Sequence, residues 1–502
     1  MVYTDRFANY LATASSTVES RYQELLDPII NFYTDLREKY GTPLGMALLP
    51  CLHALFDAEG ELPTEALKYV SLRLSRPMGK ILEIAAFHDK FKGHGVQGRL
   101  SEELFARFAP KKIIVRQAGL LLSDLEGEAS QLSLVHEDYD LLKRAISFLP
   151  EDLIGMIELA GLRGRGGAGF PTHLKWASAR DSVRKRKLNP FLVVNADEGE
   201  PPTVKDRVLM RRPHRLIASI VACAYTVGAP LSIIYTRGDY VAEIRALRKA
   251  ITDATAAGYL GKDILGSGFD HEIMVYQGAG SYLCGADTAQ LNSIEGKFPS
   301  PRAVPPYPTD RGLNGHPTVV NNVETVCSAG VIFRDGPEEW RSVGGSRVYS
   351  VFGSVVNPGV YECPENVALH TLIELAGGHT REFKAAIPGG ISAGFETDLE
   401  AKLSNGTGAV VILDQSVNLT ELILQEIQFY GDESCGRCSS CRYGTSTVAN
   451  ILTRRLEGKS RGTDIEELQM TMDSMASNRC GLGKAVPVLL EGAIRLFPDE
   501  FV

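Results

Sequence analysis

Four cysteines near the carboxyl end place the strongest constraint on what this chain can fold into. Cys435, Cys438 and Cys441 are separated by two residues each, and Cys480 follows within Asn-Arg-Cys-Gly-Leu-Gly. This spacing lets one tight loop point three thiolates at a common centre, and a distant fourth completes the ligand set of a [4Fe–4S] cluster. Structural zinc is the alternative, but zinc sites usually come as two C-x2-C pairs. The motif therefore favours an iron–sulfur cluster and one-electron chemistry.

The remaining cysteines and the start of the chain indicate a reducing compartment. Cys51, Cys223, Cys284, Cys327 and Cys363 form no C-x-x-C pair, so we expect buried free thiols. The amino terminus lacks the apolar core of a signal peptide, and no uninterrupted apolar stretch reaches transmembrane length. We expect a cytoplasmic protein without direct membrane insertion. The net charge of −8 and one short basic run give no indication of nucleic-acid binding.

Periodicity and composition divide the 502 residues into several parts. We expect a helical docking segment at 1–92, a connector at 93–137, an α/β domain at 138–340, a compact α+β domain at 341–412 and a helical domain at 413–502. In the third part, helical patterns alternate with β-rich runs at 191–195, 231–235 and 271–276. That alternation is typical of an α/β layer fold.

A glycine-rich loop stands at 164–169, within Gly-Arg-Gly-Gly-Ala-Gly. It satisfies G-x-G-x-x-G, but the segment before it is helical in pattern and not a strand, so the ordinary dinucleotide fingerprint fails on context. Arg163 and Arg165 flank the glycines, and a helix follows. Backbone N–H groups at a helix start, together with basic side chains, suit a phosphate group, and a plain turn is the alternative.

Polar loops follow the predicted strands of the α/β part. Asn195, Asp197, Glu198 and Glu200 lie after the first of them, where ligands gather in open α/β sheets. Flavin edges, ribose hydroxyls or a metal are candidate ligands, and a solvated acidic loop is the alternative. A second loop contains Tyr282, Gly285 and Asp287, with glycines that permit close approach of a ligand. The cluster at 321–325 is either a helix cap or a ring-contacting pair of amides.

These motifs in this order closely resemble the flavoprotein subunit of the NADH-oxidising module of respiratory complex I and its relatives in NAD-linked hydrogenases and formate dehydrogenases. The match covers roughly 138–502, and the matching stretches are Gly161 to Thr172 with Leu174-Lys-Trp, Asn195-Ala-Asp-Glu with Glu200-Pro and Lys205-Asp-Arg, Gly278-Ala-Gly with Tyr282 and Cys284-Gly, Pro317 to Thr325, and Glu433 to Arg442 with Cys480. The resemblance implies a Rossmann-like FMN-binding α/β domain, a ubiquitin-like β-grasp domain, and a C-terminal helical bundle that carries the cluster.

The resemblance also implies roles for individual residues. FMN is expected to be held by Gly164, Arg165, Gly166, Lys175, Asn195, Asp197, Glu198, Tyr282, Gly285, Asn321, Asn322 and Thr325. NAD(H) is expected to meet Phe170, Glu200 and Asp287, and Glu198 and Glu200 are the expected catalytic residues. The implied function is an NADH dehydrogenase-type subunit that passes electrons between NAD(H) and an iron–sulfur chain, because flavin converts hydride into single electrons.

Several positions depart from the family pattern. Ala286 and Asp287 replace two glutamates, Ser178 replaces an aromatic residue, Val304 replaces a lysine and Tyr307 replaces a phenylalanine. In the family these positions grip the nicotinamide and adenine. A second hypothesis follows, in which the chain is an FMN/[4Fe–4S] relay that passes electrons between protein partners without NAD(H).

Residues 45–91 resemble the helical start of the small thioredoxin-like [2Fe–2S] subunit. In that family cysteines come next, but residues 52–222 of this chain contain none. We therefore expect a separate [2Fe–2S] subunit, and a larger iron–sulfur or metalloenzyme subunit, as partners. We also expect the rest of the chain to keep its cofactors when residues 1–92 are removed.

Overall fold

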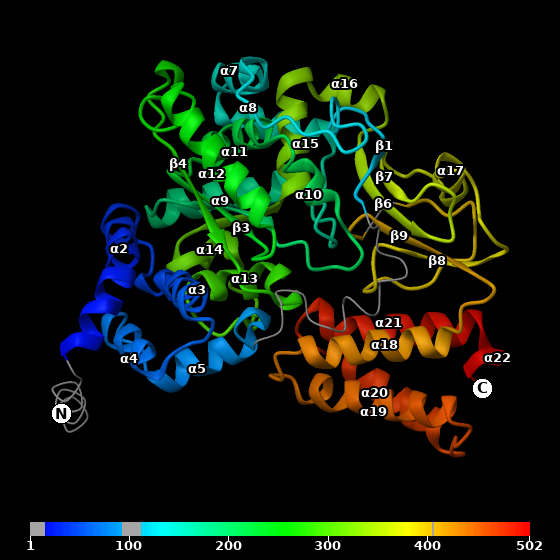
Figure 1. The fold of residues 1–502 in the computed structure, drawn as a ribbon. Coiled ribbons are helices and arrows are strands. Elements are labelled where there is room, and N and C mark those ends of the chain that lie inside the picture. Colours follow the sequence, from blue (N-terminus) through cyan, green and yellow to red (C-terminus); the bar gives the residue numbers. More distant parts are fainter. Residues whose placement is uncertain (1–15, 93–111, 404–405, 502) are drawn as a thin grey trace.

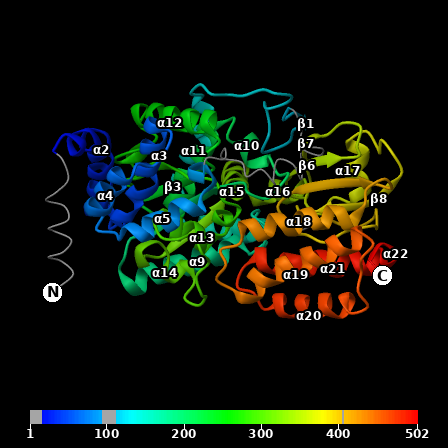
Figure 2. The same cartoon turned by 60° about the horizontal axis from the view of Figure 1, so that its bottom comes forward.

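In the computed structural model, which describes residues 16–92, 112–403 and 406–501, the chain forms two sheets flanked by two groups of helices (Figure 1). The N-terminal helices lie beside the first sheet, and the C-terminal helices lie beneath the second. Figure 2 shows the same division from a second direction. None of the helices in these residues is both long and apolar enough to span a bilayer.

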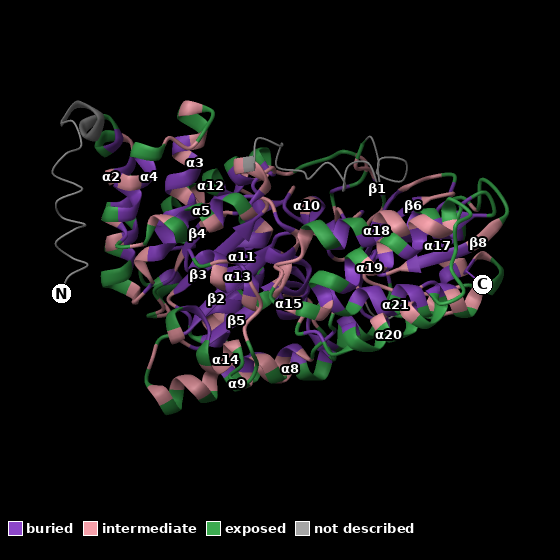
Figure 3. Ribbon diagram, turned by 90° about the horizontal axis from the view of Figure 1, so that it is seen from below, coloured by how far each residue is buried: buried purple, intermediate pink, exposed green. Residues whose placement is uncertain are grey.

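The first sheet has four parallel strands in the order β4-β3-β2-β5. The strands are β2 (Phe191–Ala196), β3 (Leu231–Thr236), β4 (Glu272–Gln277) and β5 (Thr318–Asn322). The strands predicted at 191–195, 231–235 and 271–276 are confirmed, whereas β5 was not predicted. Every residue of β2 and β3 is buried (Figure 3), as in a parallel sheet that is covered on both faces.

One face of this sheet is covered by helices from the same α/β part of the chain. These helices are α7 (Asp140–Ile146), α8 (Pro150–Ala160), α9 (Thr172–Arg186), α10 (Lys205–Leu209), α11 (Pro213–Val227), α12 (Val241–Ala256), α15 (Val323–Asp335) and α16 (Pro337–Ser342). Helix α13 (Asp287–Ile294) instead joins the core on the opposite face through Leu291 and Ile294, and the short α14 (Pro308–Arg311) packs against α9 and β5. Leu192, Val194 and Ala196 of β2 join a core built largely from α7, α8, α11 and α15. The alternate residues of the same strand point the other way.

The opposite face is covered by the N-terminal helices. They are α2 (Ser16–Tyr40), α3 (Leu48–Glu59), α4 (Thr64–Arg73) and α5 (Met78–Phe87). Phe191, Val193 and Ile233 share one core with these helices. The Tyr276 hydroxyl donates to the Met46 carbonyl at 3.1 Å. The segment expected to dock a partner is therefore also the cover of the first sheet, and the expectation that the rest of the chain would be unaffected by its removal is not supported.

The second sheet is mixed and has the order β1-β7-β6-β9-β8. Its strands are β1 (Val115–Gln117), β6 (Arg347–Gly353), β7 (Gly359–Cys363), β8 (Phe383–Pro388) and β9 (Ala409–Asp414), with helix α17 (Leu369–Leu375) between β7 and β8. β6 and β7 form an antiparallel hairpin, and β9 returns parallel to β6. This order agrees with the expected β-grasp fold. β1 comes from the segment expected to be a connector and adds an edge strand.

The C-terminal part is a bundle of α18 (Leu419–Glu433), α19 (Ser439–Leu456), α20 (Asp464–Ala476) and α21 (Gly481–Leu496), followed by α22 (Pro498–Phe501). Cys438 directly precedes α19, and Cys480 directly precedes α21. The expected helical region that carries the cysteines is therefore present. Figure 1 places the bundle against the second sheet, with α21 running toward α22 at the C-terminus.

A chain that lacks residues 1–92 should fail to fold cooperatively. Phe191, Val193 and Ile233, which are fully buried, would face water at a cost of about 1.5–3 kcal/mol each. The loss of cooperativity is measured by thermal unfolding, monitored by near-ultraviolet circular dichroism. A truncated chain that unfolds in one sharp transition and binds flavin would contradict the packing described above.

Point variants give a finer test of the same interface. Leu52 of α3 is fully buried, so Leu52→Ala should lower the free energy of unfolding by about 2–5 kcal/mol. Leu72 of α4 is 36% exposed and provides the matched control, for which a change below about 0.5 kcal/mol is expected.

Candidate functional site

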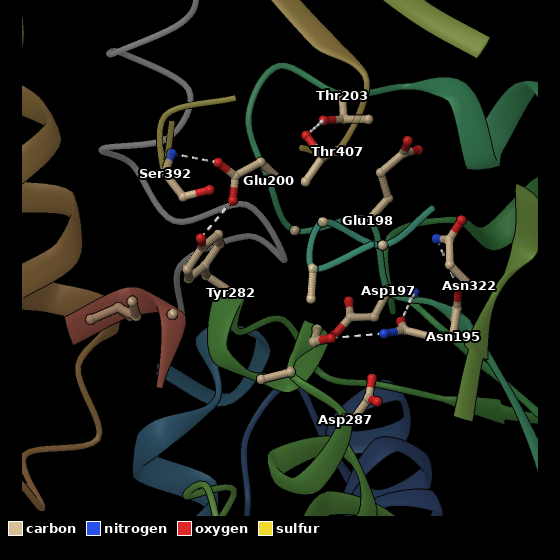
Figure 4. A pocket seen from close by; sticks show the side chains of 18 of the residues that line it. Asn195, Asp197, Glu198, Glu200, Thr203, Tyr282, Asp287, Asn322, Ser392 and Thr407 are labelled. Atoms are coloured by element: carbon tan, nitrogen blue, oxygen red, sulfur yellow. Dashed lines mark hydrogen bonds between the residues drawn. The ribbon is translucent and has the colours of Figure 1, made fainter. Parts of the chain in front are cut away.

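A pocket of about 570 Å³ opens at the carboxyl end of the first sheet (Figure 4). Its wall comes from the glycine loop, the loops after β2 and β4, the end of β5, the connection between β8 and β9, and the start of α21. The predicted site residues that line it are Arg165, Gly166, Asn195, Asp197, Glu198, Glu200, Tyr282, Gly285, Asp287 and Asn322. A volume of this size suits a cofactor of nucleotide dimensions.

The glycine loop follows α8, which ends at Gly161 with a left-handed φ of 71°. The loop closes on itself where the Gly164 N–H donates to the Phe170 carbonyl at 2.9 Å. A side chain at Gly166 would meet Asn322 at 3.4 Å, so glycine keeps the loop close to the end of β5. Bare backbone thus faces the pocket, as a phosphate site requires.

Arg165 does not present a free guanidinium to the pocket. Its side chain is 2% exposed and pairs with Glu365 near the second sheet, and it also donates to the Ser346 carbonyl at 3.3 Å. Its backbone N–H donates to the Thr325 hydroxyl at 2.9 Å. Although the residue was expected to hold a phosphate, its charge fastens the glycine loop to the second sheet.

The loop after β2 is held from both sides. The Asn195 side-chain amide donates to the Gly285 carbonyl at 2.7 Å, and its oxygen accepts from the Asp197 N–H at 3.1 Å. Asp197 is buried, and burial raises the pKa of its carboxyl to about 7. The hydrogen bond between Asn195 and Gly285 joins the loop after β2 to the loop after β4.

Glu198 faces the short helix α10. Its carboxylate accepts from the backbone N–H groups of Asp206 at 3.0 Å and Arg207 at 3.2 Å. Burial, followed by the nearby Asp206 carboxylate, raises the pKa of Glu198 to about 7. Because both carboxylate oxygens already accept backbone hydrogen bonds, this residue organises the loop.

Glu200 connects three parts of the molecule. One of its oxygens accepts from the Tyr282 hydroxyl at 2.6 Å, and the other accepts from the Ser392 N–H at 2.7 Å (Figure 4). Ser392 belongs to a loop of the second sheet. Burial raises the pKa of the Glu200 carboxyl. Glu200 is thus a buried residue of the pocket wall whose carboxylate is fixed by two hydrogen bonds.

A buried group of charges that was not predicted as part of the site includes Lys205 and Asp206, which line the pocket. The Lys205 ammonium contacts Asp206 at 2.8 Å and Glu324 at 3.0 Å, and donates to the Asn322 side-chain oxygen at 3.0 Å. Asn322 also caps α15 by accepting from the Glu324 N–H at 3.0 Å. Of the two interpretations left open for the amide cluster, the helix cap is confirmed at Asn322, which also lines the pocket.

Five predicted site residues lie beside the pocket without lining it. Lys175 donates to the Val320 carbonyl at 2.8 Å and lies 3.5 Å from the Asp287 carboxylate. Asn321 accepts from the Trp176 indole at 2.8 Å. Gly164 and Thr325 make the loop contacts described above, and Phe170 is 51% exposed.

The residues that depart from the family pattern form two groups in space. Ala286 and Asp287 line the pocket, so these substitutions change its wall. Val304 and Tyr307 are exposed, and the Ser178 hydroxyl donates to that of Thr309 at 3.0 Å. The second group thus lies on the segment around 304–309 that packs against α9.

The four cysteines of the motif share one neighbourhood in the C-terminal bundle. Burial is the main cause that raises the pKa of Cys441 and of Cys480, and the charges of Cys435 and Cys438 raise both further. Helix starts at Cys438 and Cys480 offer partial positive charge to thiolates. Among the described residues, no three candidate ligands are placed around a single ion. A cubane does not require that, because each thiolate binds a different iron.

Cys480, the fourth cysteine of the motif, also belongs to the pocket. This residue lines the pocket together with Gly481, Leu482, Lys484, Ala485 and Val488 of α21. None of these α21 residues was predicted as part of a flavin site. One proposed cluster ligand, Cys480, is therefore also part of the wall of the nucleotide-sized pocket.

The pKa shifts predict that the flavin-free chain becomes less stable as pH rises through 7. Asp197 and Glu198 have pKa values of about 7 when folded, above their ordinary values near 4. Between those values the folded chain binds more protons than the unfolded one, so raising the pH favours unfolding. The thermal midpoint should be higher at pH 6 than at pH 8, and Asp197→Asn should reduce this difference to the part that Glu198 contributes. If the thermal midpoint of that variant depends on pH as strongly as in the wild type, the raised pKa of Asp197 is contradicted.

Both the pocket region and the cysteine region match known protein families. Residues 157–330 match the Nuo51 FMN-binding domain, and residues 421–502 match the NADH-ubiquinone oxidoreductase-F iron–sulfur binding region. An F subunit of NADH-quinone oxidoreductase from Rhizobium meliloti is 39% identical over 387 residues, which cover 72% of this chain and 91% of the relative. The F subunit from Escherichia coli is 36% identical over 389 residues, which cover 72% of this chain and 86% of the relative.

A solved structure resembles a larger share of the chain. A chain of NAD+-reducing [NiFe]-hydrogenase in the H2-reduced state matches with a TM-score of 0.79 and 27% identity, covering 91% of this chain and 92% of its own length. Residues 1–92 exceed the part left unmatched, so the likeness extends into the N-terminal helices. Given 39% identity over 72% of its length to a curated relative, the chain belongs to the family of NADH-quinone oxidoreductase F subunits.

Proposed function

We propose that this protein exchanges electrons between NAD(H) and the iron–sulfur chain of a larger redox complex. The observation that carries the proposal is the shared wall, in which Cys480 of the cysteine motif lines the same pocket as Glu200 and Asn322. Two redox groups on either side of this wall would be close neighbours. When bound, FMN accepts a hydride from NADH and releases single electrons, which is the conversion such a subunit needs.

The donor groups of the pocket fit FMN. The glycine loop offers bare backbone for the phosphate, and Lys175 adds a positive charge nearby. Asn195, Asp197 and Asn322 offer amide and carboxyl groups for the ribityl hydroxyls and the ring edge. We assign these residues, with Gly164, Gly166, Tyr282, Gly285, Asn321 and Thr325 as the supporting frame, to the FMN site. Arg165 and Glu198 position the surrounding loops.

Glu200 is the residue we assign to the nicotinamide side. It is buried, and its two hydrogen bonds fix the carboxylate at the pocket wall. We place Phe170 and Asp287 on the same side, because Asp287 lines the pocket and Phe170 offers an exposed ring for stacking.

The relay hypothesis has one specific observation in its favour. Ala286 lines the pocket where the family carries a carboxylate, and Val304 is exposed where the family carries a positive charge. Both changes remove groups that would grip NAD(H). We therefore expect weak NAD(H) binding, and its complete absence would leave a relay between protein partners.

We propose that the chain works within a complex in the cytoplasm. A thioredoxin-like [2Fe–2S] subunit and a larger iron–sulfur or metalloenzyme subunit are the partners we assign. Arg437 in the cysteine loop pairs with Glu83 of α5 at 3.0 Å and lies 4.9 Å from the Phe298 ring centroid. The N-terminal helices and the cysteine loop thus present one continuous surface to a partner. We also propose the domain limits expected from the sequence, which are 1–92, 93–137, 138–340, 341–412 and 413–502.

Cys480→Ser should abolish the cluster and weaken FMN binding, because the residue serves the cysteine set and the pocket wall together. Iron and acid-labile sulfide content, with about four irons per chain in the wild type, measure the first effect. Cys363→Ser, which alters a buried cysteine outside the set, is the matched control and should keep the iron. Unchanged iron and sulfide in the Cys480 variant would refute the ligand assignment.

Restoring the family pattern with Ala286→Glu and Val304→Lys should tighten NADH binding. Each restored contact is expected to contribute about 1 kcal/mol, so the dissociation constant should fall by about tenfold or more. Anaerobic bleaching of the flavin by NADH measures it. Val356→Lys adds the same charge at a valine of similar exposure, 52% against 48%, and should have no effect. A flavin that millimolar NADH leaves oxidised in every variant would replace the dehydrogenase proposal by the relay.

A further inference from the structure

Helix α18 carries a buried acid that no part of the proposed function uses. Glu426 is fully buried, and within the described residues neither of its carboxyl oxygens has a hydrogen-bond partner. The Tyr430 hydroxyl, one helical turn later, is buried and unpartnered in the same way. Residues four apart lie on the same face of a helix, so these polar groups are neighbours in an otherwise apolar core. Such groups are rare in native proteins and call for an explanation.

This face of α18 adjoins the pocket wall. The Tyr430 and Tyr282 rings lie 6.1 Å apart between centroids, and the Tyr282 hydroxyl donates to Glu200 at 2.6 Å. Burial, followed by the charge of Glu200, raises the pKa of Glu426 well above its ordinary value. Glu200, Tyr282, Tyr430 and Glu426 therefore form a series of polar groups that runs from the pocket into the bundle.

The surroundings decide which of the two carboxyls carries charge. Glu200 accepts two hydrogen bonds, which stabilise a carboxylate, whereas Glu426 accepts none. The helices packed against α18 contribute Val448, Leu489 and other apolar residues to the core around it. A carboxyl in such a place is kept as the neutral acid. An aliphatic residue would fill the site without an unpartnered polar group, so the acid is not needed for packing.

We propose that Glu426 is a positioning residue that holds a proton for Glu200, so that the two carboxyls share one proton and one negative charge. When negative charge increases in the pocket, Glu426 gives its proton to the Tyr430 hydroxyl, Tyr430 gives its own to Tyr282, and Tyr282 gives its own to Glu200. Because neither the Glu426 carboxyl nor the Tyr430 hydroxyl has a hydrogen-bond partner among the described residues, the transfers to and from Tyr430 run through buried water. The net change converts neutral Glu426 and anionic Glu200 into anionic Glu426 and neutral Glu200, with no electrons moved.

This proposal deepens the proposed function, because it rests on Glu200 facing the bound nicotinamide and flavin. The shift would move one negative charge from the pocket wall to the interior of the bundle. The pocket could then receive negative charge without taking a proton from solvent. The groups that face Glu426 in this account are Glu200 and Tyr282 from the pocket loops and Tyr430 from its own helix.

Infrared spectroscopy of the holoprotein, with flavin and cluster bound, tests the proposal at pH 8. The oxidised wild type should show the carbonyl stretch of a neutral carboxyl that both Glu426→Gln and Glu426→Leu lack. Chemical reduction with dithionite should shift this band in the wild type, because the neutral carboxyl is then Glu200 in place of Glu426. In Tyr430→Phe the band should remain but no longer respond to reduction. Glu426→Leu should also unfold at a temperature no lower than the wild type.

Two results would overturn the proposal. If the variants at Glu426 retain the band, this residue is not the neutral acid. If the wild-type band is present but indifferent to reduction, Glu426 is a structural acid without a link to the pocket. The wild-type measurement decides this second point even where a variant fails to fold. Because dithionite replaces NADH as reductant, a failure of NADH to reduce the flavin would count against the proposed function and leave this test intact.

Discussion

A parallel sheet has to bury both of its faces, and that constraint organises the rest of this protein. In β2, Val194 points into a core made by helices of the same α/β part, while Val193 points into a core made with helices from the start of the chain. With both faces covered, the carboxyl ends of the strands are where the sheet meets a ligand. The pocket opens there, and the N-terminal helices that complete the sheet also reach the cysteine loop through Glu83.

The pocket itself depends on contacts between parts of the chain that are far apart in sequence. Glu200 receives one hydrogen bond from the loop after β4 and one from the second sheet. Arg165 fastens the glycine loop to the same second sheet. The start of α21 closes the remaining side with Cys480. No single domain contains the site, so its geometry is set by how the sheets and the bundle pack.

Motifs predicted the local features of this structure well, because each rests on a local physical cause. The apolar runs bounded by turn residues are the strands β2, β3 and β4. Cys438 and Cys480 of the cysteine motif directly precede α19 and α21. Partners chosen by tertiary packing could not be predicted in that way. Ser392, Thr407 and Lys484 line the pocket from segments without a motif, and Lys205 is buried although lysine is normally exposed. Arg165 was expected to hold a phosphate, whereas its guanidinium pairs with Glu365, a partner that its motif does not indicate. Glu426 resembles an ordinary polar residue of a helix, and only the packing of α18 reveals that it is buried.

Three carboxyl groups in the pocket wall share a common property, which is that burial raises their pKa and favours the neutral form. This holds for Asp197, Glu198 and Glu200 alike. A site of this kind is sensitive to any charge that arrives in it, which suits a place where a hydride donor and a flavin meet beside a cluster. The central claim is that the pocket and the cysteine set are one electron path that begins with NADH. An anaerobic titration of the holoprotein with NADH, which follows the flavin absorbance together with the paramagnetic signal of the cluster, tests this most directly. The account predicts that the flavin bleaches and the signal of the reduced cluster appears in the same titration. A bleached flavin beside a cluster that stays oxidised at every NADH concentration, although dithionite reduces it, would contradict the account.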